Sequence, residues 1–259
     1  MFSNGIKPGL RVLVTAGAAG IGLAIAETFA AAGARLHICD ISDEALDACR
    51  KAHPDWGVSR CDVADEQQVA GLFQEVESGF GGLDVLINNA GIAGPTGGVE
   101  EITAADWRRT VDVNLNAQFY CTSLAVPLLR RSDDAAIICI SSVAGRLGYA
   151  YRTPYAATKW AVIGFMKSLA AELGPAGIRV NAILPGIVEG PRIERVISAR
   201  AKTLGVSYGE MEQEYLDKVS LRKMVSAGDI ANMALFLCSP VGANISGQPL
   251  SVCGNVEML

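Results

Sequence analysis

A tyrosine and a lysine lie four residues apart in a stretch that is predicted to form a helix. Tyr155 and Lys159 would share one face of a helix over residues 154–173, because residues at i and i+4 are neighbours on a helix surface. A phenol beside an ammonium group can accept and return a proton, since a nearby positive charge favours the phenolate and lowers its pKa. This spacing is also common by chance, so the pair needs support from other residues.

Two further polar residues could reach the same point. Ser142 follows the strand-like run Ala136–Ser141, which would bring its hydroxyl to the carboxyl end of a strand, beside the helix that carries Tyr155. Asn114 lies among apolar residues in a predicted helix over 104–131. It could be a buried amide that bonds a backbone carbonyl, and this structural interpretation is compatible with a catalytic one.

A glycine-rich turn near the N-terminus could bind a pyrophosphate. The segment Thr15–Gly22 follows a strand-like run and opens a helix, and its three glycines would let the backbone approach an anion. The helix start at Gly20 and Ile21 would offer free N–H groups and the positive end of the helix dipole. The spacing G-x-x-G-x-G differs from the G-x-G-x-x-G fingerprint of dinucleotide-binding folds, so a tightly packed Gly/Ala turn is an alternative interpretation.

The aspartate that ends the next strand-like run, Arg35–Asp40, supports the binding of a dinucleotide. A carboxylate at this place can accept both ribose hydroxyls of NAD and repels the 2′-phosphate of NADP. Asp40 could instead cap the following helix, but Ser42 is available for that role. No Lys or Arg lies in the glycine-rich turn, and none follows Asp40 immediately, so the sequence favours NAD over NADP.

Short strand-like runs alternate with helical stretches along the chain. This alternation predicts a doubly wound, mostly parallel α/β sheet of the Rossmann type, with helices on both faces, in one domain over residues 1–259. The segment 190–220 is charged and helix-prone, and we interpret it as a substrate lid over the carboxyl ends of the strands, the alternative being a solvated insertion. The strand-like runs are Arg11–Thr15, Arg35–Asp40, Gly57–Cys61, Leu83–Asn88, Ala136–Ser141, Arg179–Leu184 and Pro249–Val252, and the helical stretches cover 21–32, 42–53, 65–79, 104–131, 154–173 and 226–238.

Three of these helices begin with patterns that are typical of helix caps. Thr103 and Ser226 each stand three residues before an aspartate, which is the spacing of a capping box. Thr153 would place a capping hydroxyl ahead of Pro154 at the first helical position.

Charge and cysteine content exclude several classes of function. The net charge is −5 and no stretch concentrates Lys and Arg, so we expect neither nucleic acid nor an anionic membrane surface as a partner. The seven cysteines occur singly without C-x-x-C spacing, which argues against a metal site or a disulfide framework and favours free thiols in a reducing compartment. No apolar run has the length of a signal peptide or a membrane span, so we expect a soluble, cytoplasmic protein.

In the order and spacing of these motifs, the chain resembles the short-chain dehydrogenase/reductase family over essentially its whole length. The resemblance implies that Tyr155 is the general acid and base, Ser142 positions the substrate oxygen, Lys159 holds the nicotinamide ribose and lowers the pKa of Tyr155, and Asn114 anchors a water in a proton relay. It also implies that Asp62 and Val63 contact the adenine, Asn89 the ribose region and Val188 the nicotinamide amide. The motifs that carry the resemblance are Thr15–Gly22, Asp62-Val63, Asn88-Asn-Ala-Gly91, Asn114, Ser142, Tyr155-x-x-x-Lys159 and Pro185-Gly186. The residues expected to bind the cofactor are Gly17, Ala19, Gly20, Ile21, Asp40, Asp62, Val63, Asn89, Gly91, Tyr155, Lys159 and Val188.

Three positions depart from the family pattern. Ala16 follows Thr15 where the family usually has glycine, which could shift the conformation of the turn. Gly190 stands where a threonine is often found, so we expect one hydrogen bond to the cofactor amide to be missing. Cys253 replaces an aspartate that many members carry. None of the three belongs to the expected catalytic set.

The expected reaction is reversible hydride transfer between NAD(H) and a small-molecule secondary alcohol or its ketone, as in NAD-dependent short-chain alcohol dehydrogenases. An NAD-dependent epimerase or dehydratase is one alternative, but those enzymes resemble a longer branch with an added C-terminal domain. A non-catalytic NAD-binding sensor or scaffold is another, although such a protein would not need all four catalytic residues. We also expect a homo-oligomer, a tetramer by resemblance, because the helix over 154–173 is apolar on nearly every face.

The substrate pocket is expected to be lined by the segments Ile92–Pro95, Ala144–Tyr151 and Ile187–Arg192, with part of the lid. As a further hypothesis, one arginine among Arg146, Arg152 and Arg192 binds an anionic group on the substrate, because a guanidinium fork matches the geometry of a carboxylate.

Overall fold

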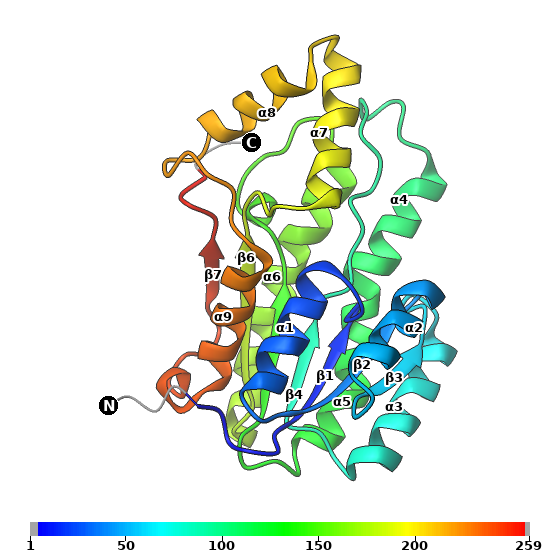
Figure 1. Cartoon of the computed structure of the whole chain (residues 1–259), viewed down its shortest axis with the longest axis vertical. Coiled ribbons are helices and arrows are strands. Elements are labelled where there is room, and N and C mark those ends of the chain that lie inside the picture. Colours follow the sequence, from blue (N-terminus) through cyan, green and yellow to red (C-terminus); the bar gives the residue numbers. More distant parts are fainter. Residues whose placement is uncertain (1–4, 257–259) are drawn as a thin grey trace.

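Seven parallel strands form the central sheet of the computed structural model, which describes residues 5–256 (Figure 1). The strand order is β3-β2-β1-β4-β5-β6-β7, so the direction in which the chain adds strands reverses between β1 and β4. Sheets of this kind bind ligands beyond the carboxyl ends of the strands at the point of reversal. The predicted doubly wound sheet is confirmed, and its strands are β1 (Arg11–Thr15), β2 (Arg35–Asp40), β3 (Gly57–Arg60), β4 (Val85–Asn88), β5 (Ala136–Ile140), β6 (Arg179–Pro185) and β7 (Pro249–Val252).

Helices cover both faces of the sheet, each face over its own hydrophobic core. Side chains of α3, α5 and α6 lie in one core, and those of α1, α2 and α9 lie in the other. On β1, Leu13 enters the first core while Val12 and Val14 enter the second, as expected for a strand buried on both faces. The helices are α1 (Gly20–Ala31), α2 (Asp43–Ala52), α3 (Glu66–Phe80), α4 (Ala104–Val111), α5 (Ala117–Leu129), α6 (Thr153–Leu173), α7 (Pro191–Leu204), α8 (Tyr208–Asp217) and α9 (Ala227–Cys238).

The helical stretch predicted over 104–131 is present over 104–129, but the type of helix changes in its middle. A π-helical segment, η1 (Asp112–Asn116), separates α4 from α5 and contains Asn114. The hydrogen bonds of the Asn114 amide to residues from other elements, given below, provide the physical reason. Single π turns inside α-helices are frequent at functional sites.

Two of the three predicted helix caps are present. Ser226 and Asp229 form a capping box at the start of α9, and the Thr103 hydroxyl accepts from the Asp106 N–H at the start of α4. The cap predicted for Thr153 is wrong, because Thr153 is already the first residue of α6 and its side chain caps nothing. Pro154 then lies in the first turn, where its missing N–H costs no helical hydrogen bond.

The segment that is expected to be a lid forms α7 and α8, at the end of the molecule beyond the carboxyl ends of the strands (Figure 1). These helices have a small hydrophobic core of their own, in which Ile197 and Met211 pack with Val143 and Ile187 from the edge of the sheet. The Tyr215 hydroxyl also bonds the Tyr149 hydroxyl at 2.7 Å. The two helices are thus packed against the carboxyl edge of the sheet.

Candidate active site

Three of the predicted catalytic side chains meet at the carboxyl end of β5. Ser142 follows β5, and Tyr155 and Lys159 lie near the start of α6. The Lys159 ammonium is 5.7 Å from the centre of the Tyr155 ring, and the Ser142 hydroxyl is close enough to the phenol to favour its ionisation. Lys159 is buried whereas Tyr155 is partly exposed, so the phenol is accessible to a ligand and the ammonium group is shielded from water.

The surroundings of Tyr155 favour its ionisation. Burial by itself would raise the pKa of the phenol, but the positive charges of Lys159, Arg192 and Arg152 and the hydrogen bond from Ser142 outweigh burial. The pKa of Tyr155 is therefore lowered from its ordinary value of 10.0. Burial also lowers the pKa of Lys159, and the charge of Arg192 adds to that effect. The arrangement suits a phenol that exchanges a proton with a ligand.

Close contacts between β5 and α6 hold these side chains in place. The Ser141 hydroxyl donates to the Lys159 carbonyl at 2.8 Å, and the Lys159 ammonium donates to the Ile140 carbonyl at 2.9 Å. The short turn η2 (Val143–Gly145) follows Ser142, and a Cβ at Gly145 would come within 2.7 Å of the Lys159 carbonyl oxygen. Glycine at position 145 therefore allows the chain that carries Ser142 to approach α6.

Asn114 is fully buried and its amide is engaged on both sides. Its Oδ1 accepts from the Ile92 N–H at 2.7 Å, and its Nδ2 donates to the Ile92 carbonyl and to the Thr158 hydroxyl, each at 3.1 Å. A Cβ at Gly91 would lie 3.3 Å from Asn114 Oδ1 and 3.4 Å from Lys159 Nζ. Asn114 thus fixes the loop after β4 next to Lys159, and sequence reasoning missed its partner Thr158, which lies one residue before that lysine.

The glycine-rich turn has the close backbone contacts that its sequence predicts. Ala16 has φ 49°, so the residue that replaces the usual glycine adopts the left-handed conformation that favours glycine. A Cβ at Gly17 would come within 2.8 Å of a side chain on β2, and one at Gly22 would collide with the Ala16 carbonyl. The Asn89 amide donates to that carbonyl at 3.0 Å and ties the turn to the end of β4.

The first turn of α1 is open to an anion. Ala19 stands at the N-cap and supplies no side-chain hydrogen bond, whereas the starts of α2, α3, α4, α8 and α9 each have one. A Cβ at Gly20 would meet no atom within 4 Å. The free N–H groups at Gly20 and Ile21, with the positive end of the helix dipole, fit a pyrophosphate.

Asp40 lies against the glycine-rich turn at the end of β2. Its Oδ2 accepts from the Ala18 N–H at 3.3 Å, and its Oδ1 accepts from the N–H groups of Ile41 and Ser42 at 2.8 and 3.1 Å. Ser42, and not Asp40, caps α2 by accepting from the Ala45 N–H. The carboxylate is therefore placed beside the turn and is not the cap of α2.

Asp62 and Val63 follow β3 at the same edge of the sheet. One oxygen of Asp62 accepts from the Ala64 N–H at 3.0 Å and the other pairs with Arg109 at 3.1 Å, while Val63 is buried. Because β2 and β3 are paired neighbours, both residues lie on the side of the sheet where Asp40 ends its strand.

The segment after β6 positions Val188 and Gly190. Val188 forms a parallel bridge with Val225, in which the hydrogen bonds involve the Ile187 carbonyl and the Glu189 N–H. This pattern leaves the N–H and the carbonyl of Val188 pointing away from Val225. They are therefore free to bond the nicotinamide amide, as the resemblance implies. Gly190 has φ 126° at the start of α7, a conformation that a threonine would adopt only with strain.

A cavity of about 330 Å³ opens beside this cluster. Its walls come from Gly91–Gly94, Thr96 and the first turns of α7, and it includes Arg152, Arg192 and Arg195. The expected pocket segments 92–95 and 187–192 contribute to it, but 144–151 does not. Within that segment, Arg146 is exposed and bonds Pro249 and Ser251 on β7.

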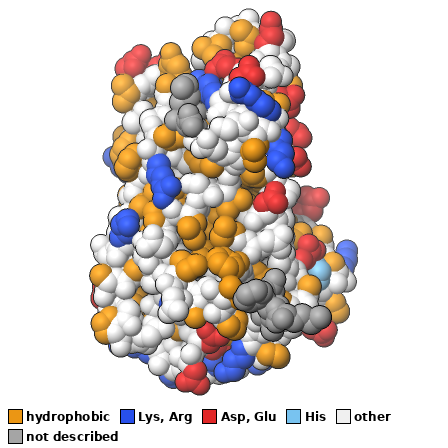
Figure 2. Space-filling model, turned by 90° about the vertical axis from the view of Figure 1, so that its left-hand side faces the viewer, with side chains coloured by type: hydrophobic (Ala, Val, Ile, Leu, Met, Phe, Trp, Pro, Cys, Tyr) orange, Lys and Arg blue, Asp and Glu red, His pale blue; other side chains and the backbone are white. Residues whose placement is uncertain are grey.

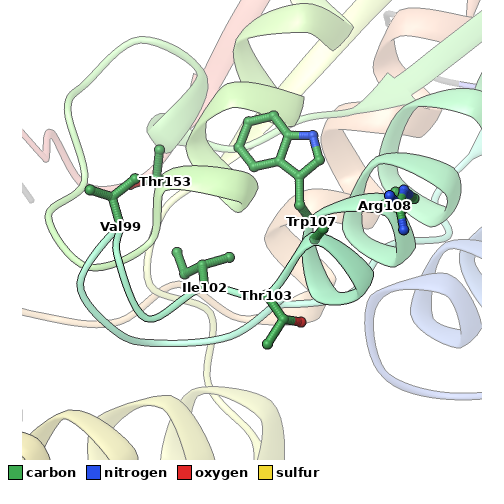
Figure 3. Close-up of a pocket in the computed structure, with 7 residues that line it drawn as sticks. Val99, Ile102, Thr103, Trp107, Arg108 and Thr153 are labelled. Carbon is green, nitrogen blue, oxygen red and sulfur yellow. The ribbon is translucent and has the colours of Figure 1, made fainter.

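A second hollow, of about 370 Å³, lies away from the predicted catalytic residues. Figure 3 shows Trp107 on α4 facing it, with Val99 and Ile102 on the preceding loop and Thr153 at the start of α6. None of the sequence-predicted site residues lines it, whereas Gly91 lines the first cavity.

Residues 5–256 contain no group of three or more His, Cys, Asp or Glu side chains that could hold a metal ion. In the same residues no helix is long and apolar enough to cross a membrane. All seven cysteines are free thiols, and six of them are buried.

Comparisons with known proteins show which family the chain is similar to. A family model described as enoyl-(acyl carrier protein) reductase matches residues 16–255. The chain is 34% identical to 7alpha-hydroxysteroid dehydrogenase of Escherichia coli over 95% of its length and 93% of the relative's. It is 35% identical to the granaticin polyketide synthase putative ketoacyl reductase 1 of Streptomyces violaceoruber, over 94% of its length and 92% of the relative's.

Solved structures with the same fold include two reductases. Levodione reductase superposes with a TM-score of 0.88 at 30% identity, covering 95% of this chain and 97% of its own. A variant of actinorhodin polyketide ketoreductase, solved with NADPH, gives a TM-score of 0.91 at 31% identity and covers 96% of this chain and 97% of its own. With the family model and these relatives spanning nearly the whole sequence, the chain belongs to the short-chain dehydrogenase/reductase family of oxidoreductases.

Proposed function

We propose that this protein is an NAD(H)-dependent dehydrogenase that interconverts a secondary alcohol and its ketone. The observation that carries the proposal is the cluster of Tyr155, Ser142 and Lys159, in which the pKa of the phenol is lowered, beside an uncapped helix start that fits a pyrophosphate. Family membership supports the same class of reaction.

Each residue of the cluster has a distinct role in this proposal. Tyr155 takes the hydroxyl proton of an alcohol during oxidation and returns it to the ketone oxygen during reduction. Ser142 donates to the same oxygen and orients it. Lys159 stabilises the phenolate by its charge and binds the nicotinamide ribose. Asn114 holds the loop at Gly91 in place and anchors a water that relays the proton onward.

When it is bound, the nicotinamide supplies or accepts the hydride, and the protein orients it. We propose that the adenine end lies over Asp62 and Val63, the ribose region beside Asn89 and Gly91, and the nicotinamide amide against Val188. The pyrophosphate would lie on the turn and helix start formed by Gly17, Ala19, Gly20 and Ile21, with Asp40 at the adenosine ribose.

The choice of NAD rests on Asp40. Its carboxylate lies at the end of β2 and bonds the Ala18 N–H of the glycine-rich turn, which would place it at the adenosine ribose. Arg60, on the neighbouring strand, pairs with Asp43 at 3.3 Å. A 2′-phosphate would therefore meet a negative charge and no unpaired cation from the carboxyl ends of these two strands.

NADH is expected to bind at least about tenfold more tightly than NADPH, because two like charges about 4 Å apart near a surface repel by about 4 kcal/mol at an effective dielectric constant of 20. Titration of both cofactors by nicotinamide fluorescence measures the difference. Asp40→Asn keeps the shape of the side chain and removes its charge. It should raise the affinity for NADPH and so reduce the difference between the affinities for the two cofactors. Glu44→Gln, at an exposed position in the first turn of α2, is the matched control and should leave the difference between the two affinities unchanged. Equal affinities of the wild-type protein for the two cofactors would contradict the assignment.

Two other functions remain as alternatives to the dehydrogenase. An epimerase or dehydratase would bind NAD without releasing NADH, and a sensor or scaffold would bind it without turnover. A panel of secondary alcohols, followed by the absorbance of released NADH, separates these possibilities from a dehydrogenase. The free, mostly buried thiols support a proposal that the protein works in a reducing compartment such as the cytoplasm.

We propose a tetramer on the basis of two apolar surfaces. Large side chains on α4, α5 and α6 remain exposed, and the exposed fractions of Trp160 and Phe119 are 53% and 56%. Figure 2 shows hydrophobic side chains gathered on a second face, over β7 and α9, where Phe236 and Val241 are exposed. Two surfaces of this kind allow two different twofold contacts, as a tetramer requires.

Light scattering at micromolar concentration is expected to give four times the mass of the 27.1 kDa chain. Phe119→Asp should reduce it to a dimer, because a buried unpaired carboxylate disfavours one of the two contacts. Val206→Asp, at an exposed position between α7 and α8, is the control and should remain a tetramer. A stable wild-type monomer would disprove the proposal.

A further inference from the structure

Three arginines line the cavity beside Tyr155 without an acidic partner. Arg152 immediately precedes α6, and Arg192 and Arg195 come from the first turns of α7. Within residues 5–256 no carboxylate lies within 4.0 Å of any of the three guanidinium groups, although other arginines, such as Arg109 and Arg131, do form ion pairs. The cavity therefore concentrates uncompensated positive charge.

Arg152 is the most unusual of the three because it is almost completely buried, with 4% of its surface exposed. One guanidinium nitrogen donates to the Ala93 carbonyl at 2.7 Å, and the group lies 5.2 and 5.1 Å from the ring centres of Tyr149 and Tyr155. Its Nε is buried and has no hydrogen-bond partner. A buried guanidinium without a negatively charged partner is energetically costly. Arg152 is therefore suited to bind an anion that enters the cavity from solvent.

Arg192 and Arg195 line the same cavity as Arg152 but are exposed to solvent. Arg192 donates to the Gly91 carbonyl at 3.1 Å, which brings α7 over the loop beside Lys159. Arg195 lines the same wall of the cavity. An anion held at Arg152 could thus be approached by a second guanidinium from α7.

We propose that the substrate carries a carboxylate, which Arg152 binds with help from Arg192 and Arg195, so that the protein acts on a small hydroxy acid or keto acid. This inference rests on the proposed dehydrogenase function, since it places the carboxylate next to the oxygen that Tyr155 would serve. A planar guanidinium matches a carboxylate better than an ammonium group does, and the low-dielectric wall strengthens the pair. The volume of about 330 Å³ lies at the small end of the range of ligand pockets.

The cofactor diphosphate is a second source of the same negative charge, and the experiment separates the two. A chain-length series of keto acids is offered with NADH, each beside its uncharged carboxamide. The variants are Arg195→Met, at an exposed position, and Arg152→Lys, which keeps the positive charge but removes the planar guanidinium and its paired N–H donors. Arg146→Met is the matched control, because Arg146 bonds Pro249 and Ser251 outside the cavity.

The wild-type protein is expected to prefer at least one acid over its carboxamide by about 10- to 100-fold in kcat/KM, the size of a charged hydrogen bond. Both variants should reduce this preference, measured as the ratio of kcat/KM for the acid and its carboxamide, at least about fivefold with the Kd of NADH little changed, whereas Arg146→Met should retain it. Equal rates for acid and carboxamide across the series would overturn the inference. A rise in the Kd of NADH with an unchanged preference would overturn it too, because the cofactor would then be the anion.

Binding is measured in parallel as the rise in melting temperature of the NADH-saturated protein with each acid and its carboxamide. A rise with an acid that its carboxamide does not cause, and that Arg195→Met abolishes, supports the carboxylate site even if no ketone is reduced. In that case it is the proposed dehydrogenase function that fails. The absence of any such difference, together with reduction of neutral ketones, overturns the carboxylate site and leaves the dehydrogenase standing.

Discussion

Replacing Tyr155 with phenylalanine is expected to lower kcat by about 10²–10⁴, the usual contribution of a general acid and base. The substitution keeps the ring that packs near Lys159 and Arg152 and removes only the hydroxyl. The hydride would still be positioned, but the alcohol proton would have no acceptor at the reacting oxygen. Ser142 cannot replace it, because a serine hydroxyl can donate to that oxygen but has no means of retaining a second proton.

The fall in rate must be separated from a loss of folding or of cofactor binding. The Kd of NADH and the melting temperature should stay close to those of the wild-type protein, since the lost hydroxyl is not part of the hydrophobic core. The rate should be measured with a substrate deuterated at the carbinol carbon, which shows whether hydride transfer limits turnover. If Tyr155→Phe retained more than about a tenth of the wild-type rate with chemistry limiting, another group would be the base.

Much of the sheet could be predicted because its signals are local. The strands β1, β2 and β4 are short, largely apolar runs that end at Thr15, Asp40 and Asn88, and the apolar run of β5 is followed by Ser141 and Ser142. Tyr155 and Lys159 could be paired because helical spacing by itself puts them on one face. Once parallel strands are expected, their carboxyl ends must meet at one edge, and this brings the glycine-rich turn and the catalytic cluster together.

The parts that could not be predicted depend on contacts between distant segments. The π turn at Asn114 follows from hydrogen bonds to Ile92 and Thr158, which lie in other parts of the chain, and nothing in the local sequence distinguishes it from a regular helix. The sequence gives no reason to distinguish Arg146 from Arg152. In the structure Arg146 bonds β7 at the surface, whereas Arg152 is buried near the rings of Tyr149 and Tyr155. That difference is set by tertiary packing.

Lys159→Met should produce the second large effect, a shift in the pH dependence together with weaker cofactor binding. Among the groups that lower the pKa of Tyr155 against the effect of burial, the charge of Lys159 is the largest, followed by that of Arg192. Methionine has a similar length and no charge, so the pKa of the phenol should rise. The ribose would also lose its ammonium donor, and the Kd of NADH should increase.

The sign of the shift follows from the role of the phenolate. Oxidation of an alcohol needs the deprotonated phenol, so kcat/KM for oxidation should rise with pH and level off above the pKa of Tyr155. Reduction of a ketone needs the protonated phenol, so its rate should fall with rising pH through the same pKa. Because an unperturbed phenol has a pKa near 10, only about one in a thousand would be ionised at pH 7 without the neighbouring charges.

Lys159→Met should therefore move the pH profiles of oxidation and reduction to higher pH. Lys167→Met, two turns further along α6 and bonded to Gly247, is the control and should move neither profile. If the profiles of Lys159→Met coincided with those of the wild-type protein, the charge of Lys159 would not control the ionisation that limits the reaction.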